Sequence, residues 1–241
     1  MLKIKNITAV SESQSLLKDI NLEVKAGEIH AIMGPKHSGK TALAHVIAGH
    51  PSIQITDGNV TYKKKKLLPL EAGERSKRGI FTSMQYPPEF EGITNWELLE
   101  EIFSARGEPI ADLKVKYTTY CEILNLGQAH AERHPNSGQL LMGEAKRNEL
   151  LHMLMLSPDL VVLDEIDQGL GDEETVLVAA MVKDFLDNDT DRAAIVITHN
   201  QQLLDILEPT HVHVMVEGEI RISGGSELYT RIVEDGYSEF S

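Results

Sequence analysis

Two short segments of the chain carry residue types that can bind a polyphosphate and a metal ion. The first, residues 34–41, reads Gly-Pro-Lys-His-Ser-Gly-Lys-Thr and satisfies the pattern G-x-x-x-x-G-K-[S/T] in full. In such a loop, backbone N–H groups and the N-terminus of the following helix bind phosphate oxygens, the lysine adds a positive charge, and the threonine can ligate Mg²⁺. The predicted nucleotide-binding residues are Gly34, Pro35, Lys36, His37, Ser38, Gly39, Lys40, Thr41 and Ala42.

The second segment is an apolar run, residues 160–163, that ends in the carboxylate pair Asp164 and Glu165. Next to a phosphate-binding loop, an aspartate at a strand end is suited to hold Mg²⁺, directly or through water. The adjacent glutamate can orient or deprotonate an attacking water. The alternative, two solvated acids that close a strand, becomes the weaker interpretation once the loop is taken into account.

Gln85 and His199 each follow an apolar run that reads as a buried strand. Ligands of parallel sheets gather at the carboxyl ends of the strands, so both side chains are candidates for the same site. Each is ambiguous by itself, because a single histidine at a strand end is more often structural.

These residues need a framework of strands and helices, and the apolar periodicity predicts one. Strands are expected at 2–7, 20–24, 28–33, 58–62, 79–84, 160–163 and 193–198, and helices at 41–48, 96–106, 110–126, 143–156 and 175–186. The alternation of strands and helices predicts a mainly parallel sheet covered on both faces. The stretch from 95 to about 126 contains helical patterns and no convincing strand, so we interpret it as a helical insertion.

Length and charge restrict the possible classes of protein. A chain of 241 residues allows one core with an insertion, and the formal charge of −14 argues against a general affinity for nucleic acid or anionic membranes. The only basic run, residues 63–66, is interpreted as a solvated turn, and the single Cys121 excludes an internal disulfide. No signal peptide and no apolar run of about 20 residues is present, so we expect a cytoplasmic protein without direct membrane insertion.

The order of these motifs resembles the ABC ATPase family and, within it, the SufC-type soluble ATPases of iron–sulfur cluster assembly. The resemblance runs from about residue 2 to 238. The phrases that carry it are Ala31-Ile32-Met33-Gly34-Pro35, Phe81, Gln85-Tyr86-Pro87, Lys146-Arg147-Asn148-Glu149, Leu163-Asp164-Glu165-Ile166-Asp167, Thr198-His199, His211-Val212-His213-Val214 and Asp235-Gly236-Tyr237.

The resemblance implies a fold, cofactors and residue roles. The fold would be an α/β P-loop nucleotide-binding domain with a mainly parallel sheet and N-terminal antiparallel strands. A core of residues 1–90 and 157–241 and a helical subdomain of about 91–156 would form one domain. The implied cofactors are ATP and Mg²⁺, with Thr41, Gln85 and Asp164 at the metal. Gln85 would sense the metal and the γ-phosphate, Glu165 would activate water, and His199 would contact the γ-phosphate.

The chain departs from the family where one copy covers the nucleotide of another. The family's Ser-Gly-Gly signature falls on Leu141, Met142 and Gly143, so its serine and first glycine are replaced. The nearby Ser137-Gly138-Gln139 would substitute only if the loop were shifted by several residues. His37 stands where the phosphate loop usually has glycine, and Gly171 stands where an aspartate is expected.

Three functions therefore remain open. By resemblance, the chain is a slow or partner-stimulated ATPase that forms a nucleotide-dependent homodimer and moves a SufB/SufD-like scaffold, contacted through the Gln85 segment and the helical insertion. The second possibility is a regulatory subunit of that complex that binds ATP but hardly hydrolyses it. The third is the nucleotide-binding subunit of a membrane transporter. No residue indicates the preferred base.

Overall fold

The computed structural model describes residues 1–12, 14–83, 85, 92–111, 113–135 and 141–237. Met84, Tyr86, Pro87 and the alternative signature segment 137–139 lie outside the described residues. The elements are β1 (Leu2–Ser11), β2 (Gln14–Val24), β3 (Ile29–Met33), α1 (Lys40–Ala48), β4 (Gln54–Tyr62), β5 (Lys65–Lys66), α2 (Ala72–Lys77), β6 (Ile80–Ser83), α3 (Asn95–Arg106), α4 (Leu113–Ile123), the 3₁₀ helix η1 (Gln128–Glu132), α5 (Met142–Leu156), β7 (Leu160–Asp164), α6 (Asp172–Asp187), β8 (Ala193–Ile197), α7 (Gln201–Leu207), β9 (His211–Val216), β10 (Glu219–Gly224) and α8 (Ser226–Asp235).

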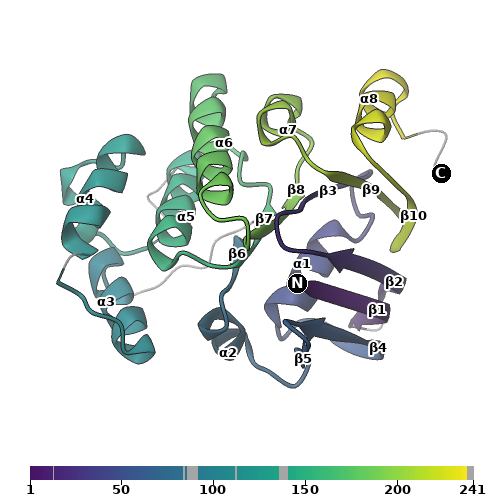
Figure 1. Cartoon of the computed structure of the whole chain (residues 1–241), viewed down its shortest axis with the longest axis horizontal. Coiled ribbons are helices and arrows are strands. Elements are labelled where there is room, and N and C mark those ends of the chain that lie inside the picture. Colours follow the sequence, from purple (N-terminus) through teal and green to yellow (C-terminus); the bar gives the residue numbers. More distant parts are fainter. Residues whose placement is uncertain (13, 84, 86–91, 112, 136–140, 238–241) are drawn as a thin grey trace.

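The strands form two sheets (Figure 1). The larger sheet has the order β10-β9-β3-β8-β7-β6, and all its pairs are parallel except the antiparallel edge pair of β9 and β10. The smaller sheet, β2-β1-β4-β5, is antiparallel throughout. A mainly parallel sheet with N-terminal antiparallel strands is the architecture that the sequence predicts.

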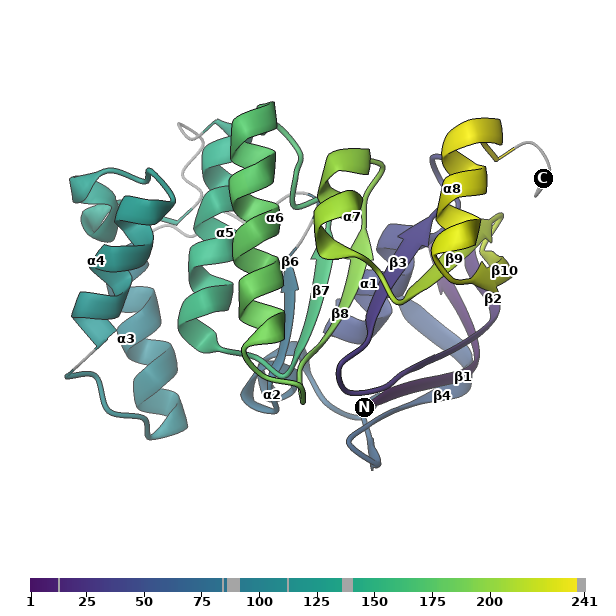
Figure 2. The same cartoon turned by 45° about the horizontal axis from the view of Figure 1, so that its top comes forward.

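Helix α1 lies between the two sheets and is held by the first of three hydrophobic clusters. Leu43 and Ile47 of α1 belong to the same cluster as Leu17 of the small sheet and Ile32 and Val162 of the large one. The other face of the large sheet packs against α5, α6 and α7, which lie along it in Figure 2. Strands buried on both faces are almost entirely apolar, which is why β3, β7 and β8 read as hydrophobic runs in which His30 of β3 and Asp164 at the end of β7 are the polar exceptions.

The first two strands are longer than the sequence pattern predicts. β2 begins at Gln14 instead of residue 20, and β1 continues to Ser11 instead of ending at residue 7. Register shifts interrupt the pairing of β1 with both neighbours, and Asn6 and Asp19 adopt left-handed backbone angles of φ 52°. Each irregularity breaks the two-residue alternation on which the prediction depended.

The helical stretch predicted after residue 95 contains α3, α4 and η1, followed by α5, and no strand occurs between α3 and β7 in the described residues. α4 is shorter than the predicted 110–126. α3 and α4 lie at the end of the molecule away from the small sheet (Figures 1 and 2). Leu99 of α3 and Tyr117 of α4 nevertheless share a cluster with Leu150 of α5 and Val161 of β7, so these helices are packed continuously onto the core.

Two minor expectations concern Cys121 and the membrane. Cys121 is buried, and its burial raises the pKa of the thiol, in agreement with a role as a small apolar residue. Within the described ranges, none of the helices combines the length and the apolarity that a membrane crossing requires.

Candidate nucleotide-binding site

The phosphate-binding loop joins the carboxyl end of β3 to the first turn of α1. Gly34 has φ 144°, and a Cβ there would lie 2.0 Å from the Met215 carbonyl oxygen. Gly39 has φ 103°, and its Cβ would lie 2.8 Å from the Leu16 carbonyl oxygen. Both glycines are therefore required by backbone conformation and by the close approach of neighbouring main chain.

Lys40 points back over its own loop. Its ammonium donates to the carbonyl oxygens of Gly34 at 2.7 Å and Pro35 at 2.8 Å, and lies 3.4 Å from the Ser38 hydroxyl. Burial lowers the pKa of Lys40, while the charges of Glu165 and Asp164 oppose that shift. A phosphate bound in the loop would exchange these neutral acceptors for charge-assisted bonds to the same ammonium.

Asp164 ends the fully buried strand β7 and is 1% exposed. Neither carboxylate oxygen accepts a hydrogen bond of normal geometry within the described part of the chain, although the Thr41 hydroxyl lies close enough to lower the pKa. Burial raises the pKa of Asp164 to about 6 and the charge of Glu165 adds to the shift, whereas Thr41, Lys146 and Lys40 oppose it. Two unpartnered carboxylate oxygens close to a threonine hydroxyl fit the donor set that Mg²⁺ prefers. Asp164 and Thr41 are therefore the residues of this chain suited to hold that ion.

Glu165 and Gln85 are brought together by adjacent strands. The Gln85 Nε2 donates to Glu165 Oε2 at 2.9 Å, which joins the residue after β7 to the segment after β6. Glu165 has a left-handed φ of 50°, and its N–H donates to the Ile197 carbonyl oxygen of β8 at 2.8 Å. This main-chain bond holds the glutamate at the same sheet edge as Asp164.

His199 follows β8 at this edge and is exposed. Its Nδ1 lies 3.3 Å from the Tyr237 hydroxyl, and the two rings meet edge to face. Although the residue as a whole is exposed, partial desolvation of its ring and the charge of Lys40 lower the pKa of His199, while Glu165 and Asp167 oppose the shift. All four strand-end residues that the sequence singles out, Gln85, Asp164, Glu165 and His199, thus lie at the carboxyl edge of the large sheet, as does the phosphate loop.

Lys146 of α5 reaches the carboxyl edge of the large sheet. Its side chain is 0% exposed, and its ammonium donates to the main-chain oxygen of Asp164 at 3.2 Å and to Glu149 Oε2 at 3.3 Å. A buried cation beside Asp164 offsets part of the carboxylate's desolvation.

The segment that aligns with the family signature begins α5. Leu141 is the N-cap residue, makes no side-chain capping bond, and is 79% exposed. The retained glycine, Gly143, has a different role, because a Cβ there would lie 2.6 Å from the Gly169 carbonyl oxygen. Gly143 therefore allows the first turn of α5 to touch the main chain that follows β7.

The backbone conformation accounts for His37, whereas nothing in the structure explains the glycine at position 171. His37 adopts φ 63°, the left-handed region in which glycine is favoured, so its backbone conformation is the one that the family glycine would take. Gly171 is the N-cap of α6, has φ −79°, and has open space where a Cβ would stand. Its N–H is capped by Glu174 Oε2 at 3.1 Å.

The turn between β9 and β10 supports the loop and was missed in the sequence. Gly218 N–H donates to the Ser38 carbonyl oxygen at 2.9 Å, and Met215 lies against Gly34. The only local signal in the sequence is Glu217-Gly218 between two apolar runs. This pair indicates a turn, but it does not indicate that the turn contacts the phosphate loop.

The contact of Gly143 with Gly169 generates the first prediction. Gly143→Ala should lower the free energy of unfolding by about 1–3 kcal/mol, because the added methyl overlaps a main-chain carbonyl that cannot rotate away. Gly73→Ala is the matched control, since Gly73 also lies in a helix but has nothing near its Cβ position, and alanine there should be neutral or stabilising. Urea unfolding measures both, and equal changes in the two variants would contradict the assignment.

The isolated carboxylate of Asp164 generates the second prediction. Because its folded-state pKa, about 6, exceeds the unfolded value, 3.8, its contribution to stability is present at acidic pH and is lost as pH rises through 6. Without divalent ions, Asp164→Asn should therefore gain stability over the parent chain between pH 4 and 7.5, by up to about 3 kcal/mol. Chemical unfolding at several pH values measures the difference, with Asp172→Asn at the exposed start of α6 as control. A pH-independent difference for Asp164→Asn would refute it.

Comparison with known proteins agrees with this geometry. The chain matches the family model described as ABC transporter over residues 17–168. It is 42% identical to the probable ATP-dependent transporter slr0075 of Synechocystis over 98% of this chain and 94% of the relative, and 38% identical to Vegetative protein 296 of Bacillus subtilis over 98% and 91%. The dimeric ATP-binding cassette MJ0796 bound to ADP and Pi has the same fold, with a TM-score of 0.79 at 22% identity, covering 93% of this chain and 98% of that one. The chain belongs to the ABC transporter family of ATP-binding cassette proteins.

Proposed function

We propose that the chain is a slow or partner-stimulated Mg²⁺-dependent ATPase whose nucleotide cycle moves a SufB/SufD-like scaffold during iron–sulfur cluster assembly. In this proposal, the loop 34–42 holds the triphosphate, and Thr41, Gln85 and Asp164 hold the metal ion. Glu165 activates water, and His199 contacts the γ-phosphate. The two parts proposed for the domain are the core, 1–90 and 157–241, and a helical subdomain of about 91–156.

One observation carries the ATPase part of the proposal. The carboxyl edge of a single parallel sheet gathers a phosphate loop, an unpartnered buried carboxylate, and a glutamate bonded to a glutamine. These are the groups needed to bind a phosphate chain, a metal ion and an attacking water at one place. The sequence phrases shared with SufC-type ATPases support the scaffold as the partner.

Glu165 tests catalysis separately from binding. Glu165→Gln should reduce multiple-turnover phosphate release at least a hundredfold while ATP binding with Mg²⁺ remains within a fewfold, since the amide cannot take a proton from water. Lys40→Ala should abolish both. Isothermal titration calorimetry and a phosphate-release assay with the scaffold present measure the two properties. A release rate that Glu165→Gln leaves unchanged would favour the regulatory subunit that binds but hardly hydrolyses ATP.

Leu141 tests whether two copies pair over the nucleotide. Leu141→Ser should stabilise the fold by about 1 kcal/mol, because a serine N-cap accepts a bond from the first turn of α5. If the signature of one copy closes the site of another, the same change should raise ATP turnover roughly tenfold or more, the value of one recovered charge-assisted contact. Leu141→Ala controls for removal of the exposed apolar side chain. Stabilisation without faster turnover would refute the pairing.

A transporter subunit is the second candidate, and the names of several relatives favour it. Both candidates share the nucleotide site, so the partner decides between them. Affinity purification of the chain from its native cell should bring down a β-rich scaffold without membrane spans if our proposal holds, and a multispanning membrane protein if it fails.

A further inference from the structure

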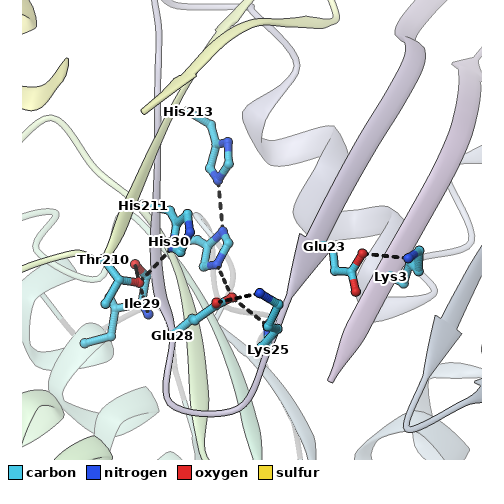
Figure 3. Close-up of polar contacts among 9 residues, drawn as sticks. All are labelled: Lys3, Glu23, Lys25, Glu28, Ile29, His30, Thr210, His211 and His213. Carbon is cyan, nitrogen blue, oxygen red and sulfur yellow. Dashed lines mark hydrogen bonds and ion pairs between the residues drawn. The ribbon is translucent and has the colours of Figure 1, made fainter. Parts of the chain in front are cut away.

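Three histidines and a glutamate gather at the end of the large sheet opposite the nucleotide site. His30 is the second residue of β3, and His211 and His213 lie at the start of β9, so all stand near the amino ends of parallel strands. Glu28 lies in the turn that leads from the small sheet into β3. Figure 3 shows these side chains turned toward one another.

We propose that Glu28, His30 and His211 form a binding site for a divalent transition-metal ion, for which Zn²⁺ fits the donor set best. One ligand atom from each residue lies within 4.8 Å of the other two. Two imidazole nitrogens and a carboxylate oxygen are a common zinc donor set when a water completes the coordination.

His211 is held with a nitrogen free for coordination. The Thr210 hydroxyl donates its single proton to the Ile29 carbonyl oxygen at 3.0 Å and also lies 3.0 Å from His211 Nδ1. The contact between the Thr210 hydroxyl and His211 is then a hydrogen bond only if His211 Nδ1 carries the proton. In that tautomer the free lone pair of His211 is on Nε2. Fixing the tautomer through the other ring nitrogen is how proteins orient metal-ligating histidines.

His30 is oriented in a similar way, by a chain of hydrogen bonds through His213 to Ser223. Its Nδ1 lies 2.9 Å from His213 Nε2, and His213 Nδ1 lies 2.7 Å from the Ser223 hydroxyl. When His30 Nδ1 donates to His213, the lone pair of His30 Nε2 faces Glu28 Oε2 across 3.0 Å (Figure 3). In the other tautomer His30 Nε2 carries the proton and donates to Glu28 Oε2, and a bound metal ion would displace that proton and lie between the same two atoms. Zinc–ligand bonds of about 2 Å place two tetrahedral ligands roughly 3.3 Å apart, close to this separation.

His30 and His213 are both buried, and burial lowers the pKa of each ring, while the contact with Glu28 opposes the shift at His30. The rings of His30 and His211 stack at 4.4 Å between centroids. The one cation facing the group in the described structure is Lys25, whose ammonium is 3.7 Å from Glu28 Oε1 and whose side chain is 71% exposed, free to swing into water.

The three proposed ligands differ in solvent exposure, so a metal ion can reach the site and the more exposed ligands can be substituted. His30 is 1% exposed, whereas the Glu28 side chain is 17% exposed and His211 is half-buried. An ion can therefore enter past Glu28 and His211. Replacement of His211 removes its ring stack on His30 but leaves the contact of His30 with His213 in place.

The test uses the untagged full-length chain, stripped of metal by a chelator and titrated with ZnCl₂ by calorimetry. The expected result is one equivalent bound with micromolar or tighter affinity and a Tm raised by about 5 °C at a hundredfold excess over Kd. Co²⁺ in place of Zn²⁺ should give visible d–d bands. His211→Ala should weaken the affinity at least a hundredfold and Glu28→Gln at least tenfold, and both should lose the Co²⁺ bands.

His50→Ala is the control, because His50 stacks on His45 at 4.4 Å and forms with it a histidine pair outside the proposed site. This variant should bind as the parent chain does. Zinc binding that survives in His211→Ala, or that is lost only in His50→Ala, would overturn the site, as would no uptake by the parent chain. ATP binding by His211→Ala should remain unchanged, so failure of the metal site and failure of the proposed ATPase function are distinguishable.

Discussion

The structure depends on placing one charged group, the carboxylate of Asp164, where water cannot reach it. The aspartate ends a strand that is buried on both faces, and its main-chain oxygen accepts a bond from the buried ammonium of Lys146. Its own oxygens accept no hydrogen bond of normal geometry in the part of the chain that the structure describes. A carboxylate in this position opposes folding at neutral pH unless a cation joins it. The core of the large sheet therefore supplies the free energy that keeps this acceptor available.

The phosphate loop follows β3 and lies at the same sheet edge as the Asp164 carboxylate, which follows β7. Main-chain contacts, not side chains, determine the conformation of the loop. Gly34 and Gly39 lie against the carbonyl oxygens of Met215 and Leu16, so strand β9 and the small sheet both determine the curve of the loop. Lys40 is folded into that curve. The antiparallel strands at the start of the chain thus belong to the site although none of their side chains was predicted to take part in it.

Local sequence patterns predicted the structural features that depend on residues close together in the chain, and few of the others. The loop, the strand before Asp164 and the positions of α1, α5 and α6 follow from short motifs and apolar periodicity. The length of β1 was wrong because its register shifts hide the alternation. Contacts between distant residues were beyond reach: nothing local shows that Gly143 touches Gly169, or that His30 meets His211 from 181 positions away in the chain. The assigned roles of Gln85, Glu165 and His199 stay predictions.

The contact between Gly143 and Gly169 has a mechanical consequence. At this junction the main chain of Gly143 lies against that of Gly169, with the side chains of Met142 and Leu170 packed beside the two glycines. Packing this close couples the position of the first turn of α5 to that of the segment that follows Glu165. A partner that binds α5 would therefore act on the geometry around the metal-binding edge.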